Sequence, residues 1–150
     1  KLISTYRHLA RHFPFIYLED PFGEEAFLEF SALRRTLGSK VVVVGDDLTT
    51  TNVQRMEKAH ANQSVNGVII KPNQIGTVSE TLLAVRLARK YEWEVVISHR
   101  SGETNDDFIA DFAYGVGADG LKLGAPARGE RVAKYNRLLE IERVENKFEV

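Results

Sequence analysis

The run Val-Val-Val-Val at residues 41–44 is followed, 26 residues further along, by Gly-Val-Ile-Ile at residues 67–70. Neither run alternates polar with apolar side chains, so both faces of each strand are expected to be buried. Strands buried on both faces are typical of a parallel sheet that is covered by helices. These two runs therefore predict an α/β fold.

Three further short runs keep the same interval. The five runs begin at residues 15, 41, 67, 94 and 120, so that successive starts lie 26, 26, 27 and 26 residues apart. This interval accommodates one strand, one helix and two short loops. We expect strands at residues 15–18, 41–44, 67–70, 94–97 and 120–123.

The segments between these runs have the apolar spacing of amphipathic helices. They predict helices at residues 2–11, 24–37, 53–61, 77–91, 106–114 and 130–143. Gly38 is a stop signal directly after one of these helices, and Asn52 is suited to cap the start of another. No linker interrupts the pattern, so we interpret residues 1–150 as a single partial domain.

Regular alternation of strands and helices is compatible with an open doubly wound sheet or with a (β/α) barrel. The even spacing and the absence of a Gly-x-Gly-x-x-Gly loop favour the barrel. A closed barrel needs eight strands, so five strands predict a later, C-terminal part of a (β/α)8 TIM-type barrel. Met56 is the sole methionine and the sequence starts at Lys1, which leads us to expect a longer parent polypeptide.

The composition argues against several classes of protein. The chain is 43% hydrophobic and 27% charged, which is typical of a soluble globular domain. Its 20 Lys and Arg against 21 Asp and Glu give a net charge of -1, which argues against a nucleic-acid partner. No apolar stretch is long enough to span a membrane. The absence of cysteine excludes disulfides and is compatible with a cytoplasmic location.

Each predicted strand ends in ionisable or polar residues, with acids first along the chain and bases later. The ends are, in order, Glu19-Asp20, Asp46-Asp47, Lys71, Ser98-His99-Arg100-Ser101 and Lys122. Active sites of such barrels lie at the C-terminal ends of the strands. We therefore expect these side chains to converge on one pocket for a divalent cation and an anionic substrate.

Taken one at a time, these residues have ordinary explanations. An acidic pair after a strand is more often a helix cap or a solvated turn, and a strand-end lysine usually extends to water. His99 alone is compatible with a position in the core. The functional interpretation depends on five such ends at one structural level, with the acids separated from the bases.

The chemistry of the residue types narrows the interpretation. Glu19 and Asp46, on adjacent strands, offer the hard oxygen ligands that Mg²⁺ prefers, although two carboxylates alone make an incomplete site. Arg100 and Ser101 are suited to hold a phosphate, the arginine through its planar fork of donors. Lys71 is a candidate general base where burial or neighbouring positive charge favours its neutral form.

Several longer motifs surround these residues. They are Leu-Glu-Asp-Pro-Phe (18–22), Gly-Asp-Asp-Leu-Thr-Thr-Thr-Asn (45–52), Ile-Lys-Pro-Asn-Gln-Ile-Gly-Thr (70–77), Ser-His-Arg-Ser-Gly-Glu-Thr (98–104), Leu-Lys-Leu-Gly-Ala-Pro (121–126) and Ala-Lys-Tyr-Asn-Arg-Leu-Leu-Glu-Ile-Glu (133–142). In these motifs the chain resembles the enolase family, over residues 14 to 142. The combined motifs are highly specific, and the run His-Arg-Ser-Gly-Glu-Thr (99–104) is strong evidence on its own.

The resemblance implies a glycolytic lyase that uses Mg²⁺ to dehydrate 2-phosphoglycerate to phosphoenolpyruvate. It also implies a role for each of seven residues. These are Glu19 and Asp46 as magnesium ligands, Lys71 as the base that removes the C2 proton, Arg100 and Ser101 as phosphate contacts, His99 as a substrate-pocket residue and Lys122 as a carboxylate contact. By comparison with the family, the N-terminal domain, the acid glutamate, the third metal carboxylate and a mobile loop lie outside these 150 residues, so we expect the chain alone to be inactive.

Two alternatives stay open at this point. One is another lyase of the enolase superfamily, and the other is a non-catalytic fragment or binding scaffold. We also expect the isolated chain to self-associate, because a five-stranded arc has open edges and because Val43, Ile69 and Val96 are predicted to form an uncovered apolar face.

Overall fold

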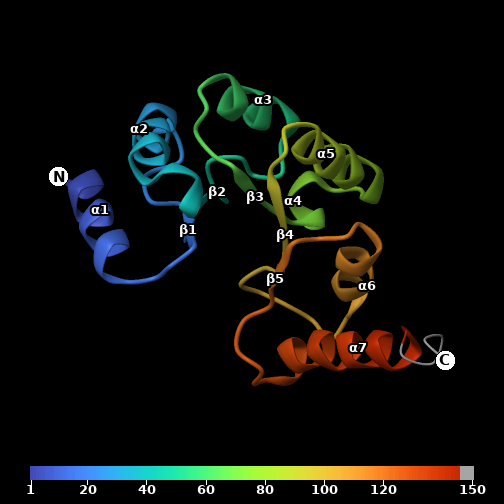
Figure 1. The fold of residues 1–150 in the computed structure, drawn as a ribbon. Coiled ribbons are helices and arrows are strands. Elements are labelled where there is room, and N and C mark those ends of the chain that lie inside the picture. The colour runs from blue at the N-terminus through green and yellow to red at the C-terminus, as the bar shows by residue number, and fades with distance from the viewer. Residues whose placement is uncertain (146–150) are drawn as a thin grey trace. The chain divides into compact units, whose positions relative to one another are not determined.

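The computed structural model describes residues 1–145, so the predicted domain of residues 1–150 includes five residues outside the described part. Strands and helices alternate along the chain (Figure 1). The strands are β1 (Tyr17–Glu19), β2 (Val42–Gly45), β3 (Gly67–Ile70), β4 (Glu94–Ser98) and β5 (Gly120–Lys122). The helices are α1 (Leu2–His12), α2 (Phe27–Leu37), the 3-10 helix η1 (Gly38–Lys40), α3 (Val53–Ala61), α4 (Pro72–Ile75), α5 (Val78–Lys90), α6 (Phe108–Gly115) and α7 (Gly129–Glu145).

The strands follow the order β1-β2-β3-β4-β5 in the sheet, so that neighbours in the chain are neighbours in the sheet. β1 pairs in parallel with β2, β2 with β3, and β4 with β5. Parallel neighbours joined through helices are the repeating unit of a (β/α) barrel. The prediction of five parallel strands that alternate with helices is confirmed, with shifts of one or two residues at some strand ends.

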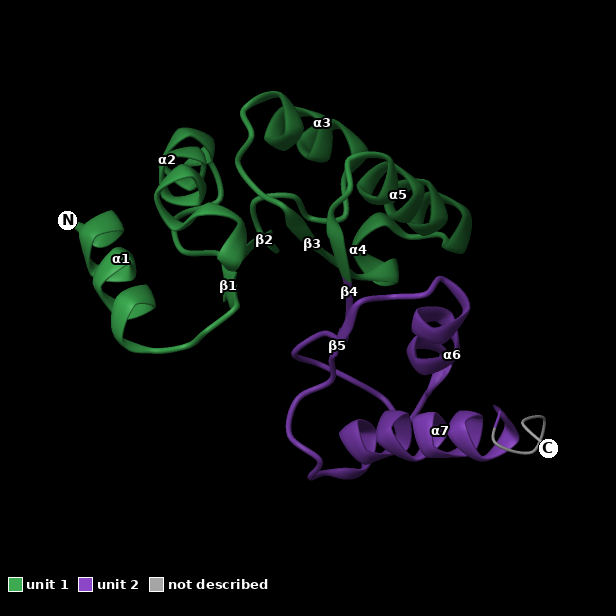
Figure 2. Cartoon of the chain, viewed as in Figure 1, with its two compact units in different colours: residues 1–95 green, residues 96–150 purple. Residues whose placement is uncertain are grey.

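The chain divides into two compact units, residues 1–95 and residues 96–150 (Figure 2). Unit 1 holds β1 to β3 with α1 to α5, and its interior includes the fully buried side chains of Phe30, Leu33 and Met56. Unit 2 holds β5, α6 and α7, and its interior includes Ala110 and Leu123. The boundary between the units falls within β4.

Local signals in the sequence explain where the helices of unit 1 begin and end. The side chain of Asn52 accepts a hydrogen bond from the backbone N–H of Arg55 at 3.0 Å, which caps α3 as predicted. Thr77 caps α5 by accepting from the N–H of Glu80 at 3.2 Å. Gly38 ends α2 with a φ of 69°, a conformation that favours glycine.

The helices α2 and α4 differ most from the prediction. α2 begins at Phe27, three residues later than expected, because a turn in which Ala26 donates to the carbonyl of Gly23 precedes it. The short helix α4 was not predicted, since four residues are too few to show a helical period. It starts at Pro72, and proline is favoured at the first position of a helix.

The prediction of an uncovered apolar face is wrong. The exposed fractions of Val43, Ile69 and Val96 are 0%, 0% and 8%, so these side chains lie in the core and form no uncovered patch. The reason is that both faces of β3, and nearly all of β2 and β4, are covered by other side chains of this chain. Within residues 1–145, no helix combines the length and the apolar character that a membrane crossing requires.

Candidate active site

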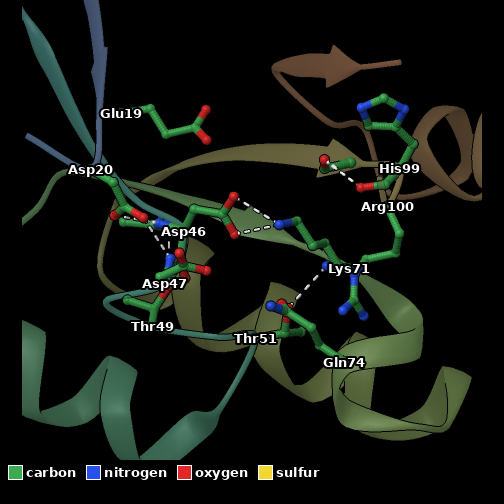
Figure 3. Close-up of polar contacts among 12 residues, drawn as sticks. Glu19, Asp20, Asp46, Asp47, Thr49, Thr51, Lys71, Gln74, His99 and Arg100 are labelled. Carbon is green, nitrogen blue, oxygen red and sulfur yellow. Dashed lines mark hydrogen bonds and ion pairs between the residues drawn. The ribbon is translucent and has the colours of Figure 1, made fainter. Parts of the chain in front are cut away.

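The acidic ends of β1 and β2 are joined by hydrogen bonds within unit 1 (Figure 3). Asp20 follows β1 in a left-handed backbone conformation, with a φ of 40°. Its Oδ1 accepts from the backbone N–H of Asp46 at 2.9 Å, and its Oδ2 accepts from that of Asp47 at 2.7 Å. Asp20 therefore holds the piece of backbone from which the Asp46 side chain projects.

Three carboxylates gather at this turn. Asp20, Asp46 and Asp47 each offer an oxygen, and these oxygens lie within 4.8 Å of one another. Burial raises the pKa of Asp20 above its ordinary value, the two backbone hydrogen bonds lower it, and the charges of Asp46 and Asp47 raise it again. A cation bound between the three carboxylates would relieve the repulsion among them, which is the property of a cation site.

Lys71 directly follows β3, and its amine contacts one of these carboxylates, that of Asp46. Its Nζ lies 2.6 Å from Oδ1 and 2.7 Å from Oδ2 of Asp46, and Figure 3 shows the two side chains pointing toward one another. The exposed fractions of the two side chains are 12% and 10%. A charged pair with so little contact with water is costly to separate, so the contact fixes the position of the Lys71 amine.

The backbone of Lys71 is held by the loop that follows β2. Its N–H donates to Oγ1 of the fully buried Thr51 at 2.9 Å. The Thr51 hydroxyl in turn donates to Oε1 of Gln74, in α4, at 2.8 Å. Thr51 has a φ of 55°, which is uncommon for a β-branched residue. The loop after β2, the end of β3 and α4 are thus tied together around the lysine.

Glu19, at the end of β1, is contacted by Tyr17 on the same strand. The Tyr17 hydroxyl donates to Oε2 of Glu19 at 3.0 Å. Burial raises the pKa of Tyr17 most, and the charges of Glu19, Asp46 and Asp20 each raise it further. The Tyr17 hydroxyl therefore lies in the field of all three carboxylates, which associates Glu19 with the acidic ends of β1 and β2.

In unit 2, the predicted residues after β4 lie on one loop, residues 98–104, which we call the strand-4 loop. Its first half is closed by Glu103, whose Oε1 accepts from the backbone N–H of Arg100 at 2.8 Å. Its second half is held by Lys134 of α7, a side chain that is 1% exposed. The Lys134 Nζ lies 2.8 Å from Oε2 of Glu103 and donates to the carbonyl of Thr104 at 2.7 Å.

Glu103 is charged in this setting. Burial, the largest influence, raises its pKa, but the hydrogen bonds from the Arg100 N–H and from Lys134, with the charge of Lys134, hold the pKa of Glu103 below its ordinary value. An ionised Glu103 is thus the centre of the loop's hydrogen bonds. This arrangement presents Arg100, half-buried, and Ser101, exposed, from a loop of defined conformation.

Lys122 and His99 are neighbours in the sheet. The backbone N–H of His99 donates to the carbonyl of Lys122 at 3.0 Å, which extends the pairing of β4 with β5. Both side chains are half-buried. Within unit 2, this pairing places the strand-4 loop beside the end of β5.

Several residues around the site gave no signal in the strand-end pattern. Tyr17 lies within a predicted strand, and Thr51 and Glu103 lie within motifs that resemble the family, but the resemblance implies no role for any of the three. Arg131 and Lys134 lie on α7, some 30 residues beyond the loop that they contact. Their spacing of three places both side chains on one face of that helix. This spacing is the sequence signal that could have indicated that they contact the same segment.

Comparison with known proteins places these features in a family. A family model described as the enolase C-terminal TIM barrel domain matches residues 1–148. The enolase of Sulfurisphaera tokodaii is 53% identical over 142 residues, which make up 95% of this chain and 34% of that protein. The enolase of Saccharolobus solfataricus is 51% identical over 148 residues, or 99% of this chain and 34% of that protein. The chain thus spans about a third of the length of these curated relatives.

Proposed function

The chain belongs to the enolase family, through its C-terminal TIM barrel domain, and we propose that it supplies much of a site that dehydrates 2-phosphoglycerate to phosphoenolpyruvate. The observation that carries this proposal is the contact of Lys71 with both carboxylate oxygens of Asp46, at 2.6 and 2.7 Å. It sets a candidate proton acceptor directly beside a candidate metal ligand. We propose that the protein acts in glycolysis, in the cytoplasm.

The donors at the ends of β1 and β2 fit Mg²⁺. They are carboxylate oxygens, which this hard cation prefers, and repulsion among them favours a positive charge between them. The cluster consists of Asp20, Asp46 and Asp47, and Glu19 is associated with it through Tyr17. Glu19 and Asp46 are the ligands that we propose. Asp20 is better suited to support them, because each of its oxygens already accepts a backbone N–H. When bound, Mg²⁺ supplies charge that stabilises the second negative charge on the substrate carboxylate.

The chain's own residues divide the remaining work. Lys71 pairs with Asp46 as the ammonium, and Mg²⁺ held by Asp46 would offset the charge of that carboxylate and favour the neutral amine. The neutral amine takes the proton from C2 of the substrate onto Nζ, and the electron pair of the broken C–H bond moves toward the substrate carboxylate. Lys122 holds that carboxylate with its positive charge, which favours the developing charge over the starting state. The hydroxyl at C3 then leaves as water, with a proton from the acid glutamate that the family resemblance places outside these 150 residues, and the double bond forms between C2 and C3.

The strand-4 loop orients the substrate in this proposal. Arg100 binds the phosphate through its fork of N–H donors and Ser101 adds a hydroxyl donor. His99 completes the pocket next to Lys122. The hydrogen bonds of Glu103 to the Arg100 backbone and to Lys134 support this role, since a fixed loop binds without being ordered first.

A graft tests the proposal with the residues of this chain. Residues 1–148 replace the matching segment of the Saccharolobus solfataricus enolase, and formation of phosphoenolpyruvate from 2-phosphoglycerate is followed by absorbance. We expect Mg²⁺-dependent turnover, lowered about 10²- to 10⁴-fold by Lys71→Ala and unchanged by Lys90→Ala, an exposed lysine at the end of α5. A folded graft without turnover would instead favour a non-catalytic scaffold.

A further inference from the structure

Arg131 of α7 contacts three consecutive residues of the strand-4 loop. Its Nη1 donates to the carbonyl of Arg100 at 2.9 Å, and its Nη2 donates to the carbonyl of Ser101 at 2.8 Å. Nη1 also contacts Nδ1 of His99. One guanidinium therefore reaches the backbone that carries the proposed phosphate contacts and the ring of the proposed pocket histidine.

The contact with His99 determines which ring nitrogen carries the proton. An arginine side chain has five N–H donors and no acceptor, and it keeps its charge in proteins. The nitrogen that faces it must therefore be the one with the free lone pair, which is Nδ1. In a neutral imidazole the proton then resides on Nε2.

Gly124, just after β5, keeps the ring and the guanidinium in place. A Cβ added to this glycine would lie 3.1 Å from Cε1 of His99 and 3.4 Å from Cδ of Arg131. Gly124 has a φ of 76°, and its carbonyl accepts from the hydroxyl of Tyr135 in α7. Its bare backbone thus packs against both side chains, which leaves the His99 ring little freedom to turn over.

We propose that Arg131 is a positioning residue that holds His99 as the Nε2–H tautomer and fixes the carbonyls of the strand-4 loop. His99 then offers an N–H donor, rather than a lone pair, to an anionic oxygen such as that of a phosphate or a carboxylate. The use of this donor on substrate rests on the proposed function, whereas the tautomer itself does not.

The groups that face His99 support a neutral ring. Burial lowers its pKa most, and the positive charges of Arg131, Lys122 and Lys134 lower it further, while the charge of Glu103 raises it. Because the net shift is downward, His99 is expected to stay neutral to a lower pH than an ordinary histidine. Removal of the Arg131 charge should raise the pKa of His99.

Nuclear magnetic resonance of the 150-residue chain tests the tautomer directly. The chain has four histidines, and long-range ¹H–¹⁵N correlation of their rings shows which nitrogen of each is protonated. For wild-type His99 we expect an unprotonated Nδ1 and a protonated Nε2. Arg131→Met should mix the two tautomers and raise the pKa of His99.

Arg137→Met is the matched control. Arg137 lies on the same helix, but its guanidinium pairs with Asp111 at 2.7 Å and with Glu140 at 2.9 Å instead of with the strand-4 loop. This variant should leave the ring of His99 as in the wild type. A wild-type His99 protonated on Nδ1 overturns the proposal whether or not any variant folds, and so does an Arg131→Met chain whose His99 keeps its tautomer and pKa.

Activity of the graft separates this proposal from the proposed function. Arg131→Met should raise KM for 2-phosphoglycerate about 2- to 10-fold, the range of one or two lost hydrogen bonds, with a smaller change in kcat. A graft without any turnover contradicts the proposed function, but the ring correlation still decides the tautomer. Unchanged KM in an active graft would show that the loop does not need Arg131.

Discussion

Asp20 and Asp46 differ in what their carboxylates do, although both follow a strand. Asp20 has both oxygens committed to backbone N–H groups, while Asp46 faces the amine of Lys71. A nearly buried pair such as Lys71 and Asp46 is weak evidence for stability, because desolvation of the two charges offsets their attraction. Its presence at the strand ends is better explained by a site that needs both groups in place.

The metal and phosphate roles can be separated by two substitutions in the graft. Asp46→Asn removes one anionic ligand, so the Mg²⁺ concentration needed for half-maximal activity should rise. Arg100→Ala should instead raise KM for 2-phosphoglycerate, because it removes the bidentate contact with the phosphate, and should leave the Mg²⁺ dependence nearly unchanged. Titrations of each variant with Mg²⁺ and with substrate give both values, and identical responses would contradict the division of roles.

At the scale of elements, α7 is anchored to the strand-4 loop by a buried charge pair. Lys134 is 1% exposed, and its Nζ contacts Oε2 of Glu103 and two backbone carbonyls. The loop in turn depends on Glu103 for the N–H of Arg100. The position of α7 and the conformation of the loop are therefore expected to change together.

This anchor predicts how stability depends on pH. Because the pKa of Glu103 is lower in the folded chain than its ordinary 4.5, its stabilisation is complete above 4.5 and is lost as pH falls through the folded value. Acidification below pH 4.5 should lower the free energy of unfolding of the wild type more than that of Glu103→Gln. Urea titrations at a series of pH values measure this difference. Equal slopes would show that Glu103 does not titrate with folding.

The pairing of β2 with β3 sets a second test at this scale. A Cβ on Gly67 would lie 2.8 Å from Cγ1 of Val42 and 2.8 Å from Cγ2 of Val44, so Gly67→Ala forces these side chains or the strands apart. We expect a loss of about 1–3 kcal/mol in the free energy of unfolding. Gly23→Ala, which meets nothing within 4 Å, should change it little. Thermal and urea unfolding of both variants provide the comparison.

At the scale of the whole molecule, the regular spacing predicted most of the architecture. A step of 26 or 27 residues leaves room for little besides a strand, a helix and two loops, and all five strands occur within two residues of their predicted starts. The start of α2 was predicted three residues too early, because the turn after Gly23 does not interrupt the apolar spacing from which the helix was predicted. The burial of Val43 was not predicted, because a continuous apolar run does not indicate which elements cover each face of its strand.

The candidate site was predictable only where it follows the strands. Lys71 and Asp46 were identified because each follows a strand, and the structure brings them into contact. Arg131 and Lys134 were not identified, because their partners are backbone carbonyls and a loop glutamate some 30 residues away. Their spacing of three places them on one face of α7, but it does not say which loop that face contacts, because this depends on how α7 packs.

The order of the strands carries a prediction about association. Among residues 1–145, β1 and β5 stand at the two ends of the order, and the 73% exposed Ile16 adjoins β1. Open strand edges tend to pair with other chains, so we expect the mass of the isolated chain in light scattering to rise with concentration. Ile16→Lys should weaken this rise, whereas Leu28→Lys, at a 70% exposed position on α2, should not. A monodisperse monomer would contradict the expectation.

Exchange of the C2 proton of 2-phosphoglycerate with solvent tests the central claim most directly, because it reports proton removal without requiring the hydroxyl to leave. The graft is incubated with substrate and Mg²⁺ in deuterated water, and loss of the C2 proton signal is followed by nuclear magnetic resonance. If Lys71 is the base, the graft exchanges this proton, Lys90→Ala exchanges it at the same rate, and Lys71→Ala does not exchange it. Exchange by Lys71→Ala at the unsubstituted rate would show that another group removes the proton and that the contact of Lys71 with Asp46 has a different purpose.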